Sequence, residues 1–302
     1  MPSNSFDSFD GIPNFRDVAV STASGMLSRG LLYRSAAPDD ATSNDRSKLV
    51  DEYRIKTIID LRSETEHIEA AKKSSSKVPP TPADPAQVKP YNKKDPMATL
   101  RVPGTEHKSI SLNGRPYTNA LLKQLSYWNV AKLFTYYSIG YRTDAISILG
   151  ENVMNKRGLV GLAEDSLRYS KAEIKAVFDV LADSANYPVL LHCTQGKDRT
   201  GLTVLLVLLL LGVDQNAIEK DYLMSIEGLA ADREQRLQSV RSIGLSEEFA
   251  GCPQDWVEKV SGYIQDEGGA EEYLKSCGIP SDQLSSVRSI LAGGNGSASG
   301  AA

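Results

Sequence analysis

The sequence predicts an α/β fold with a central, mostly parallel sheet flanked by helices, on the strength of three observations. Residues 30–61 carry a short apolar strand, an amphipathic helix and a β-branched strand in succession, which is the order of a βαβ unit. Residues 189–191 form another short apolar run. The stretch 202–211 that follows is almost entirely aliphatic, so it predicts a helix buried on all sides in the middle of the domain.

The first elements are predicted from local patterns. Residues 30–34 and 55–61 are predicted to be strands, the second one mostly buried because it is β-branched. Residues 43–53 predict a capped helix with Leu49 and Val50 on its inner face. The sheet is therefore expected to begin in the first sixty residues and to be completed by the strand at 189–191.

The segment 72–108 differs from its surroundings in composition. It contains eight Lys/Arg against three acidic residues, and seven of the fourteen prolines lie between Pro79 and Pro103. Such a composition buries little apolar surface. We therefore predict a single domain over residues 1–291, interrupted by a mobile basic insertion at 72–108. That insertion is either a solvated linker or a flap that attracts an anionic substrate or a membrane surface.

The rest of the chain is predicted to be largely helical. Residues 121–154 have helical spacing and contain several aromatic side chains, which we assign to the core: Tyr127, Trp128, Phe134, Tyr136, Tyr137 and Tyr141. Helices are also predicted at 170–183 and, with two breaks, over 212–291. Residues 292–302 contain no core-forming pattern and are predicted to be a disordered tail.

Composition excludes several classes of function. The 302 residues carry 34 basic and 38 acidic side chains, a net charge of −4, so no nucleic-acid partner is expected. The three histidines and three cysteines show no zinc-ligand spacing, and no metal or cofactor is predicted. The N-terminus has no signal-peptide pattern, and the longest apolar run, 202–213, is shorter than the about 20 residues that span a bilayer. We expect a cytoplasmic protein without a transmembrane segment.

The residues between the strand at 189–191 and the buried helix carry the chemistry. This loop begins with Cys193, continues with Thr194, Gln195, Gly196 and Lys197, and ends with Asp198, Arg199 and Thr200 at the start of the helix. Backbone N–H groups of such a loop form an anion site, and the helix N-terminus adds its dipole. Both effects favour a nucleophilic thiolate on Cys193. The planar fork of Arg199 is suited to hold two phosphate oxygens, and Thr200 is suited to donate its hydroxyl to the sulfur.

A leaving alcohol or phenol also needs a proton. Asp198, inside the loop, is the first candidate for this general acid. Asp165 is the second, because a flanking loop is expected to carry it. Asp60, at the end of a predicted parallel strand, is the third.

These residues resemble a known family. His192 to Gly201 matches the Cys-x5-Arg-Ser/Thr loop of the protein tyrosine phosphatase superfamily. The Gly-Lys-Asp-Arg-Thr-Gly core, residues 14–18 (Asn-Phe-Arg-Asp-Val) and residues 59–63 (Ile-Asp-Leu-Arg-Ser) resemble its tyrosine-phosphatase-like branch of broad-specificity bacterial and fungal phosphatases. The resemblance implies a twisted, mostly parallel sheet, Cys193 as the nucleophile, Arg199 as the phosphate clamp and Asp198 as the acid. A lysine at position 197 is shared with phosphoinositide phosphatases.

The sequence therefore predicts a phosphatase that acts on phosphotyrosine in proteins through a phosphocysteine intermediate. Phosphoinositide or dual-specificity hydrolysis by the same mechanism remains an alternative, with Lys197 and the basic insertion as specificity elements. A non-catalytic phospho-ligand module and a rhodanese-like sulfur transferase are lower alternatives. A reactive thiolate is also expected to be oxidation-prone, with Cys252 or Cys277 as its disulfide partner if either lies close.

Overall fold

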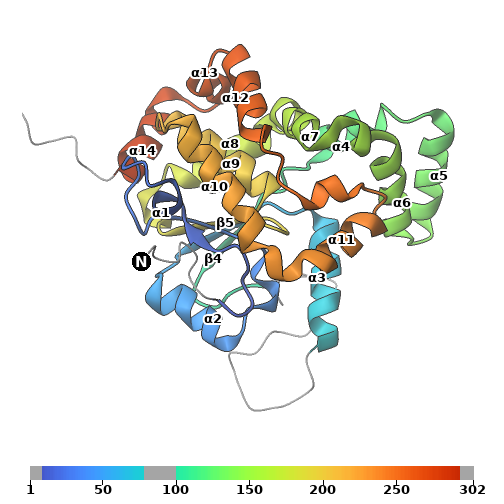
Figure 1. The fold of residues 1–302 in the computed structure, drawn as a ribbon, viewed down its shortest axis with the longest axis horizontal. Helices are drawn as coiled ribbons and strands as arrows, with labels where there is room; N and C mark the ends of the chain where they lie inside the picture. Colours follow the sequence, from blue (N-terminus) through green and yellow to red (C-terminus); the bar gives the residue numbers. More distant parts are fainter. Residues whose placement is uncertain (1–8, 78–99, 293–302) are drawn as a thin grey trace, which may run out of the picture.

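The computed structural model of the chain describes residues 9–77 and 100–292, arranged around a five-stranded sheet (Figure 1). The strand order is β1-β2-β5-β3-β4, so β5 lies in the middle. Only the β1–β2 pair is antiparallel, and the other three pairs are parallel. The strands are β1 Arg16–Asp17, β2 Leu32–Ser35, β3 Thr57–Asp60, β4 Glu106–Ser109 and β5 Val189–His192. This arrangement confirms the predicted α/β fold with a mostly parallel sheet.

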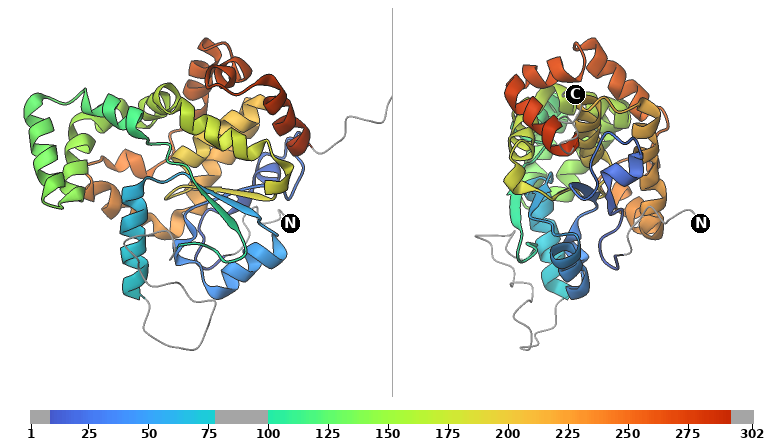
Figure 2. Two further views of the ribbon diagram at one scale, coloured as in Figure 1. Left: turned by 180° about the vertical axis from the view of Figure 1, so that it is seen from behind. Right: turned by 90° about the vertical axis from the view of Figure 1, so that its left-hand side faces the viewer.

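Helices cover both faces of the sheet and extend beyond one of its ends (Figures 1 and 2). In chain order they are α1 Val18–Thr22, α2 Ser43–Ser47, α3 Glu64–Lys77, α4 Arg115–Leu122, α5 Tyr127–Ser138, α6 Arg142–Leu149, α7 Asn155–Tyr169, α8 Lys171–Leu181, α9 Asp198–Leu210, α10 Gln215–Gly228, α11 Arg233–Ser242, α12 Trp256–Asp266, α13 Ala270–Ser276 and α14 Ser281–Ala292. Two π-helical segments, Lys48–Glu52 and Gly150–Met154, continue α2 and α6.

The alternation of side chains along the strands divides the apolar residues between two cores. Val189 and Leu191 face the larger core, which α8, α9, α12 and α14 cover. Leu190 faces the smaller core on the opposite side, with Ile58 and Leu49. Successive residues of a strand point to opposite faces, so a run of buried aliphatic residues in β5 requires helices or loops on both sides.

Helix α9 is the central element of the larger core. Ten of its residues after Arg199 are buried, namely the run from Thr200 to Leu208 and Leu210. The predicted buried helix is therefore confirmed, but it begins four residues earlier than expected, at Asp198. Arg199 and Thr200 lie at the start of the helix as predicted, and Asp198, which was expected in the loop, belongs to its first turn.

Two predicted boundaries were wrong. The helix expected at 43–53 is α-helical only to Ser47 and then becomes the π-helical segment, although Leu49 is buried as predicted. The insertion expected at 72–108 is shorter at both ends. Residues 72–77 complete α3, and residues 106–108 pair with β3 as part of strand β4. Residues 78–99 and the predicted tail after residue 292 lie outside the described residues.

The aromatic residues of 127–141 were predicted to lie in the core, and that prediction was wrong for five of the six. Tyr127, Trp128, Phe134, Tyr137 and Tyr141 are exposed, and only Tyr136 packs against a small cluster of buried residues. Helices α5 and α6 form a hairpin at the end of the molecule remote from α14 (Figure 2). Helical spacing was read correctly, but the outer side of this hairpin has nothing to pack against in the described residues.

Among the described residues, none of the helices combines the length and apolarity needed to cross a membrane. The most apolar helix, α9, is enclosed by the sheet and its neighbouring helices.

The position of α9 leads to a stability prediction. Leu205→Ala, at a site that is 1% exposed, is expected to lower the free energy of unfolding by about 2–5 kcal/mol because a cavity remains in a close-packed core. Leu209→Ala, on the half-buried side of the same helix, is the control and should cost less than half as much. Urea unfolding followed by circular dichroism measures both. Equal losses of unfolding free energy in the two variants would contradict the central position of Leu205.

Candidate active site

Three parallel strands end together at one edge of the sheet, and the candidate site lies there. His192, the last residue of β5, is paired with Ser35 of β2 and Asp60 of β3. The chain then passes through residues 193–197 and enters α9 at Asp198. The helix N-terminus and the loop therefore meet at the carboxyl edge of the sheet, where ligands bind in open α/β folds.

Side chains from distant segments hold the backbone of this loop. Asn14 donates through Nδ2 to the carbonyls of Gln195 (3.1 Å) and Gly196 (3.2 Å). Arg34 donates through Nη2 to the carbonyls of Gly196 (2.7 Å) and Lys197 (3.4 Å). In a trans peptide the N–H group points away from the carbonyl. Because Asn14 and Arg34 hold these carbonyls on one side of the loop, the N–H groups of the same three peptides are directed to the other side, which is the arrangement that an anion site requires.

Gly196 is required by the close approach of two segments. Its φ is +65°, and a Cβ at this position would lie 2.0 Å from the carbonyl oxygen of Ser35 and 2.6 Å from the nitrogen of Ala36. No other residue fits without moving β2 away from the loop.

The arginine that holds the loop belongs to a buried cluster of charges. Asp221 of α10 accepts from Arg16 Nε (2.9 Å), from Ser21 Oγ (2.6 Å) and from Arg34 Nη1. The three charged side chains are at most 1% exposed. Burial alone would raise the pKa of Asp221, but the two guanidinium groups lower it to about 2. Burial also lowers the pKa of Arg16 to about 10, which leaves it protonated at neutral pH.

Arg199 is held by Glu66, a residue that the sequence analysis did not identify. The Nη1 atom of Arg199 donates to Oε2 of Glu66 (2.7 Å), and its Nη2 atom donates to Oε1 (2.6 Å). Burial opposes both charges, yet Arg199 holds the pKa of Glu66 well below its usual value. Glu66, with smaller contributions from Cys193 and Asp198, raises the pKa of Arg199 above its ordinary value. These groups are therefore close enough to interact electrostatically.

Glu66 also caps the helix on which it lies. Its Oε2 atom accepts from the backbone N–H (2.9 Å) and the hydroxyl (2.8 Å) of Ser63, just before α3. Ser63-x-x-Glu66 is a capping-box spacing, and it follows directly after β3. That motif, at the end of a predicted parallel strand, is the signal in the sequence from which a carboxylate at the edge of the site could have been predicted.

The other predicted loop residues have distinct surroundings. Thr194 donates its hydroxyl to Glu66. The Lys197 side chain is completely buried, and its ammonium donates to the carbonyls of Phe249 (3.0 Å) and Gly251 and lies 3.3 Å from Asp198. Among the described residues, the Thr200 hydroxyl and the Gln195 side-chain oxygen are buried without a hydrogen-bond partner. Lys197 thus faces the protein interior rather than the space where further substrate phosphates would lie.

The three candidate acids differ in how strongly they are held. Asp198 is 40% exposed and lies at the start of α9, beside Arg199. Asp165 is buried in helix α7, not in a flanking loop as expected, and binds Arg157 through both oxygens (2.8 and 2.9 Å).

Asp60 is buried and accepts three bonds from the Arg62 side chain. Burial alone would raise its pKa, but His192, His67 and Arg62 hold the pKa well below the usual value, the opposite of what a proton donor needs. Asp198 is therefore the least restrained of the three.

All three cysteines are free. Cys193 is buried at the end of β5, with 2% exposure. Cys252 is half-buried, and its electrostatic partners are Lys197, Asp198, Arg34 and Arg16, which places it behind the loop. Cys277 is buried in the larger core at the end of α13. Burial raises the pKa of both Cys252 and Cys277.

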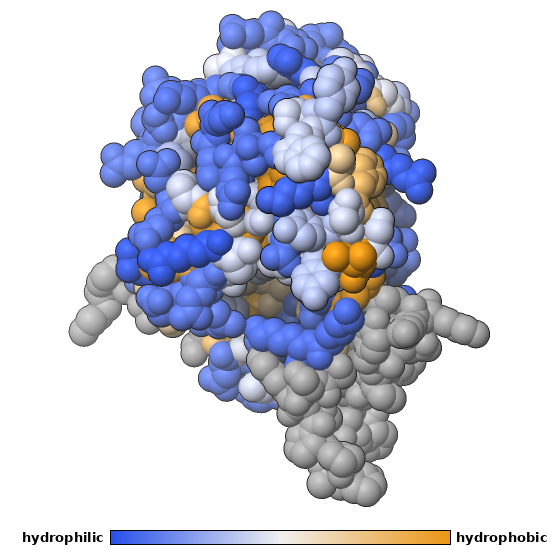
Figure 3. Space-filling view, turned by 90° about the vertical axis from the view of Figure 1, so that its right-hand side faces the viewer, coloured by the Kyte–Doolittle hydropathy of each residue, from blue (hydrophilic) through white to orange (hydrophobic). Residues whose placement is uncertain are grey.

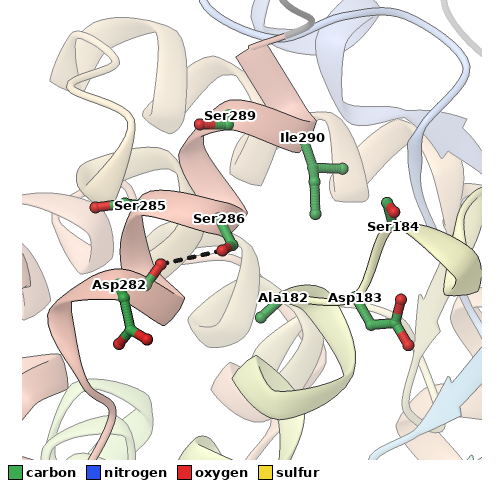
Figure 4. A pocket seen from close by; sticks show the side chains of 8 residues that line it. All are labelled: Ala182, Asp183, Ser184, Asp282, Ser285, Ser286, Ser289 and Ile290. Carbon is green, nitrogen blue, oxygen red and sulfur yellow. Dashed lines mark hydrogen bonds between the residues drawn. The ribbon is translucent and has the colours of Figure 1, made fainter.

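A separate hollow lies between the end of α8 and helix α14 (Figure 4). Its lining includes Asp183, Asp282 and several serines, and the Ser286 hydroxyl donates to the Asp282 carbonyl (3.0 Å). Two carboxylates and no cation make this an unsuitable anion site. It contains none of the loop residues, so it is not part of the candidate site.

The buried charge cluster predicts a defined dependence on pH. Asp221→Asn is expected to lower the free energy of unfolding at pH 7 by about 3 kcal/mol or more, because two buried guanidinium groups lose their counter-ion. The folded-state pKa of Asp221 is depressed to about 2, so its contribution is complete above pH ~4 and is lost as the pH falls toward 2. The difference in unfolding free energy between the wild type and Asp221→Asn should therefore become smaller as the pH falls from ~4 toward 2.

Urea unfolding at a series of pH values measures this difference. Asp179→Asn is the matched control, because Asp179 forms an exposed pair with Lys175 and such pairs contribute less than about 1 kcal/mol. A difference between wild type and Asp221→Asn that stays constant down to pH 2 would show that Asp221 is not the titrating group.

Comparison with known proteins agrees with this geometry. The sequence profile of the tyrosine phosphatase family matches residues 8–293. A tyrosine-protein phosphatase of Nostoc commune is 30% identical over 164 residues, covering 47% of this chain and 55% of the relative. The triple specificity protein phosphatase PtpB of Mycobacterium tuberculosis is 27% identical over 132 residues, covering 36% of this chain and 46% of the relative.

The matched regions thus span about half the length of these two relatives. The family profile, in contrast, extends over nearly all the described residues, including the loop, Glu66 and Asp221. The chain belongs to the tyrosine phosphatase family.

Proposed function

We propose that this protein is a cysteine-dependent phosphatase that hydrolyses phosphotyrosine in proteins through a phosphocysteine intermediate. The observation that carries the proposal is the loop whose carbonyls are bound by Asn14 and Arg34. It encloses an anion site between the Cys193 thiol and the N-terminus of α9. Membership of the tyrosine phosphatase family supports the same reaction class.

The first step is a displacement at phosphorus. The Cys193 thiolate attacks, the P–S bond forms, and the bond to the leaving oxygen breaks. Glu66 accepts from Nη1 and Nη2 of Arg199, and Nη2 also makes a longer hydrogen bond to Thr194 Oγ1 (3.4 Å). Two phosphate oxygens bind along the Nε–Nη2 edge and replace the Thr194 contact. Asp198 gives its proton to the departing phenolate oxygen. The loop amides and Arg199 stabilise the charge that develops on the equatorial oxygens.

The second step releases phosphate. Water attacks the phosphocysteine, Asp198 takes the water proton, and the P–S bond breaks to return the thiolate. Thr200 supports this step: its buried hydroxyl has no partner among the described residues, so it is available to donate to the departing sulfur.

Phosphotyrosine is favoured over phosphoinositide by the position of Lys197. A phosphoinositide site needs cations directed at additional ring phosphates. The Lys197 ammonium is instead bound to the carbonyls of Phe249 and Gly251. The hydrogen bonds of Lys197 support a role in fixing the loop to residues 249–251.

The role of the nucleophile is tested by Cys193→Ser. The variant is expected to lose phosphate release from a phosphotyrosine peptide by roughly 1,000-fold or more, because a serine hydroxyl is not ionised at neutral pH. It should still bind the peptide. Cys277→Ser, which removes a thiol far from the loop, is the control and should retain most of the activity. Turnover by Cys193→Ser at the wild-type rate would remove Cys193 from the mechanism.

The role of the acid is tested by varying the leaving group. Asp198→Asn is expected to reduce kcat with phosphotyrosine by roughly 100-fold or more, but to reduce it far less with p-nitrophenyl phosphate, whose leaving group departs without a proton. Asp165→Asn should show no such dependence on the leaving group. If the dependence on the leaving group is seen in Asp165→Asn and not in Asp198→Asn, Asp165 is the acid. If Asp198→Asn loses kcat equally with both substrates, Asp198 has a structural role only.

A further inference from the structure

Exposed apolar side chains are concentrated on one part of the surface. Eight large apolar side chains are exposed among the described residues, and six of them lie between positions 127 and 141. They are Tyr127 (97% exposed), Trp128 (78%), Phe134, Tyr137, Ile139 and Tyr141. The other two, Met26 and Ile226, lie elsewhere in the sequence. A patch of this kind marks an interaction surface, and we call these six residues the aromatic patch.

The aromatic patch lies on the outer side of α5 and on the turn to α6. Tyr127, Phe134 and Tyr137 are seven and three residues apart, so they follow one side of the helix. Leu133, the only residue of α5 that is buried, lies one helical turn before Tyr137 and packs with Ala145 and Ile148. Figure 3 looks onto this end of the molecule, where pale and orange side chains are surrounded by hydrophilic ones.

Basic side chains outnumber acidic ones around the aromatic patch. Residues 108–143 contain no Asp or Glu and five basic residues, in a chain whose net charge is −4, and Asp144 in the first turn of α6 is exposed beside them. Of the basic residues, Lys123 is exposed at the end of α4 and Lys132 in the middle of α5. Arg142 lies over the ring of Tyr137, 5.4 Å from its centroid. The aromatic patch is thus bordered by cations and is complementary to an anionic surface.

The composition of the aromatic patch indicates which anionic surface it fits. Tyrosine and tryptophan combine an apolar ring with a polar group and are enriched where a bilayer meets water. A helix with these residues on one side and lysines at its borders is suited to lie in the headgroup region of an anionic membrane. A symmetric contact with a second copy of this chain would instead place Lys123 and Lys132 against like charges.

We propose that α5 and the α5–α6 turn dock this protein on a bilayer that contains anionic phospholipids. The aromatic side chains enter the interface, and the neighbouring lysines and Arg142 contact lipid phosphates. The docking surface is separate from the 193–197 loop, and the proposal does not depend on the reaction that the loop performs.

Intrinsic fluorescence gives a direct test, because the chain has two tryptophans and the emission of only one of them is expected to respond to lipid. Trp256 is 1% exposed and stacks on Tyr222 at 4.5 Å, so it is already shielded from water. Adding vesicles of phosphatidylcholine and phosphatidylserine to the full-length protein is expected to shift the Trp128 emission to the blue. Brominated phospholipids should quench it. Trp128→Phe should abolish the shift and still sediment with the vesicles.

Substitutions separate the two parts of the surface. Replacing Trp128, Phe134 and Tyr137 together by alanine is expected to abolish sedimentation with the vesicles. The exposed pair Met26→Ala and Ile226→Ala is the matched control and should bind as the wild type does. The double variant Lys123→Gln and Lys132→Gln should bind more than roughly tenfold more weakly. Unchanged circular dichroism and Tm would show that all the variants fold.

Three results would overturn the proposal. The first is no emission shift and no sedimentation with phosphatidylserine vesicles. The second is equal binding to vesicles of phosphatidylcholine alone, which would remove the role of the charges. The third is a shift of the Trp128 emission that occurs without lipid and increases with protein concentration, accompanied by dimer formation in sedimentation velocity experiments. That result would assign the aromatic patch to self-association.

Discussion

The ion pairs of Asp221 with Arg16 and Arg34 hold the site together, because they connect α10, β1 and β2 to the loop after β5. Removing three charges from water costs several kcal/mol for each ion, and replacement of such a cluster by apolar residues is often neutral or stabilising. Stability alone therefore does not explain the cluster. Arg34 also binds the carbonyls of Gly196 and Lys197, and no apolar side chain can do that. The cluster is best understood as the support that turns the loop amides toward an anion.

Glu66 acts on the opposite side of the site in a comparable way. It fixes one edge of the Arg199 guanidinium before any ligand arrives, and its hydrogen bonds to Ser63 fix the carboxylate in turn. A clamp held in this way needs little reorganisation when negative charge develops on a bound phosphate, which is the main source of electrostatic stabilisation in enzymes. Two carboxylates, one from α10 and one from α3, thus orient the positive groups of the site that we propose to bind a phosphate.

The features that the sequence predicted correctly are those with a local signal. Short apolar and β-branched runs located β2, β3 and β5, and the strand–loop–helix pattern placed Cys193 and Arg199 at one edge of the sheet. The partners of the loop had no such signal, because Asn14 and Arg34 bind it from more than 160 positions away in the sequence. Lys197 was expected to face further ring phosphates, the transferring phosphate or solvent, the first of these because phosphoinositide phosphatases have a lysine at this position. Only the position of residues 249–251 determines that its ammonium is buried.

The misassigned aromatic residues have a different physical cause. Helical spacing reveals which residues share a side, but whether that side is covered depends on what the rest of the chain places against it. Here the small core of Leu133, Ala145 and Ile148 completes the α5–α6 hairpin without using the outer side. Because this core is separate from the one around α9, changes on the outer side and changes at the loop are expected to add independently. The proposed surface attachment and the proposed phosphate chemistry are therefore assigned to separately packed parts of the protein, and changes in one part are expected to leave the other undisturbed.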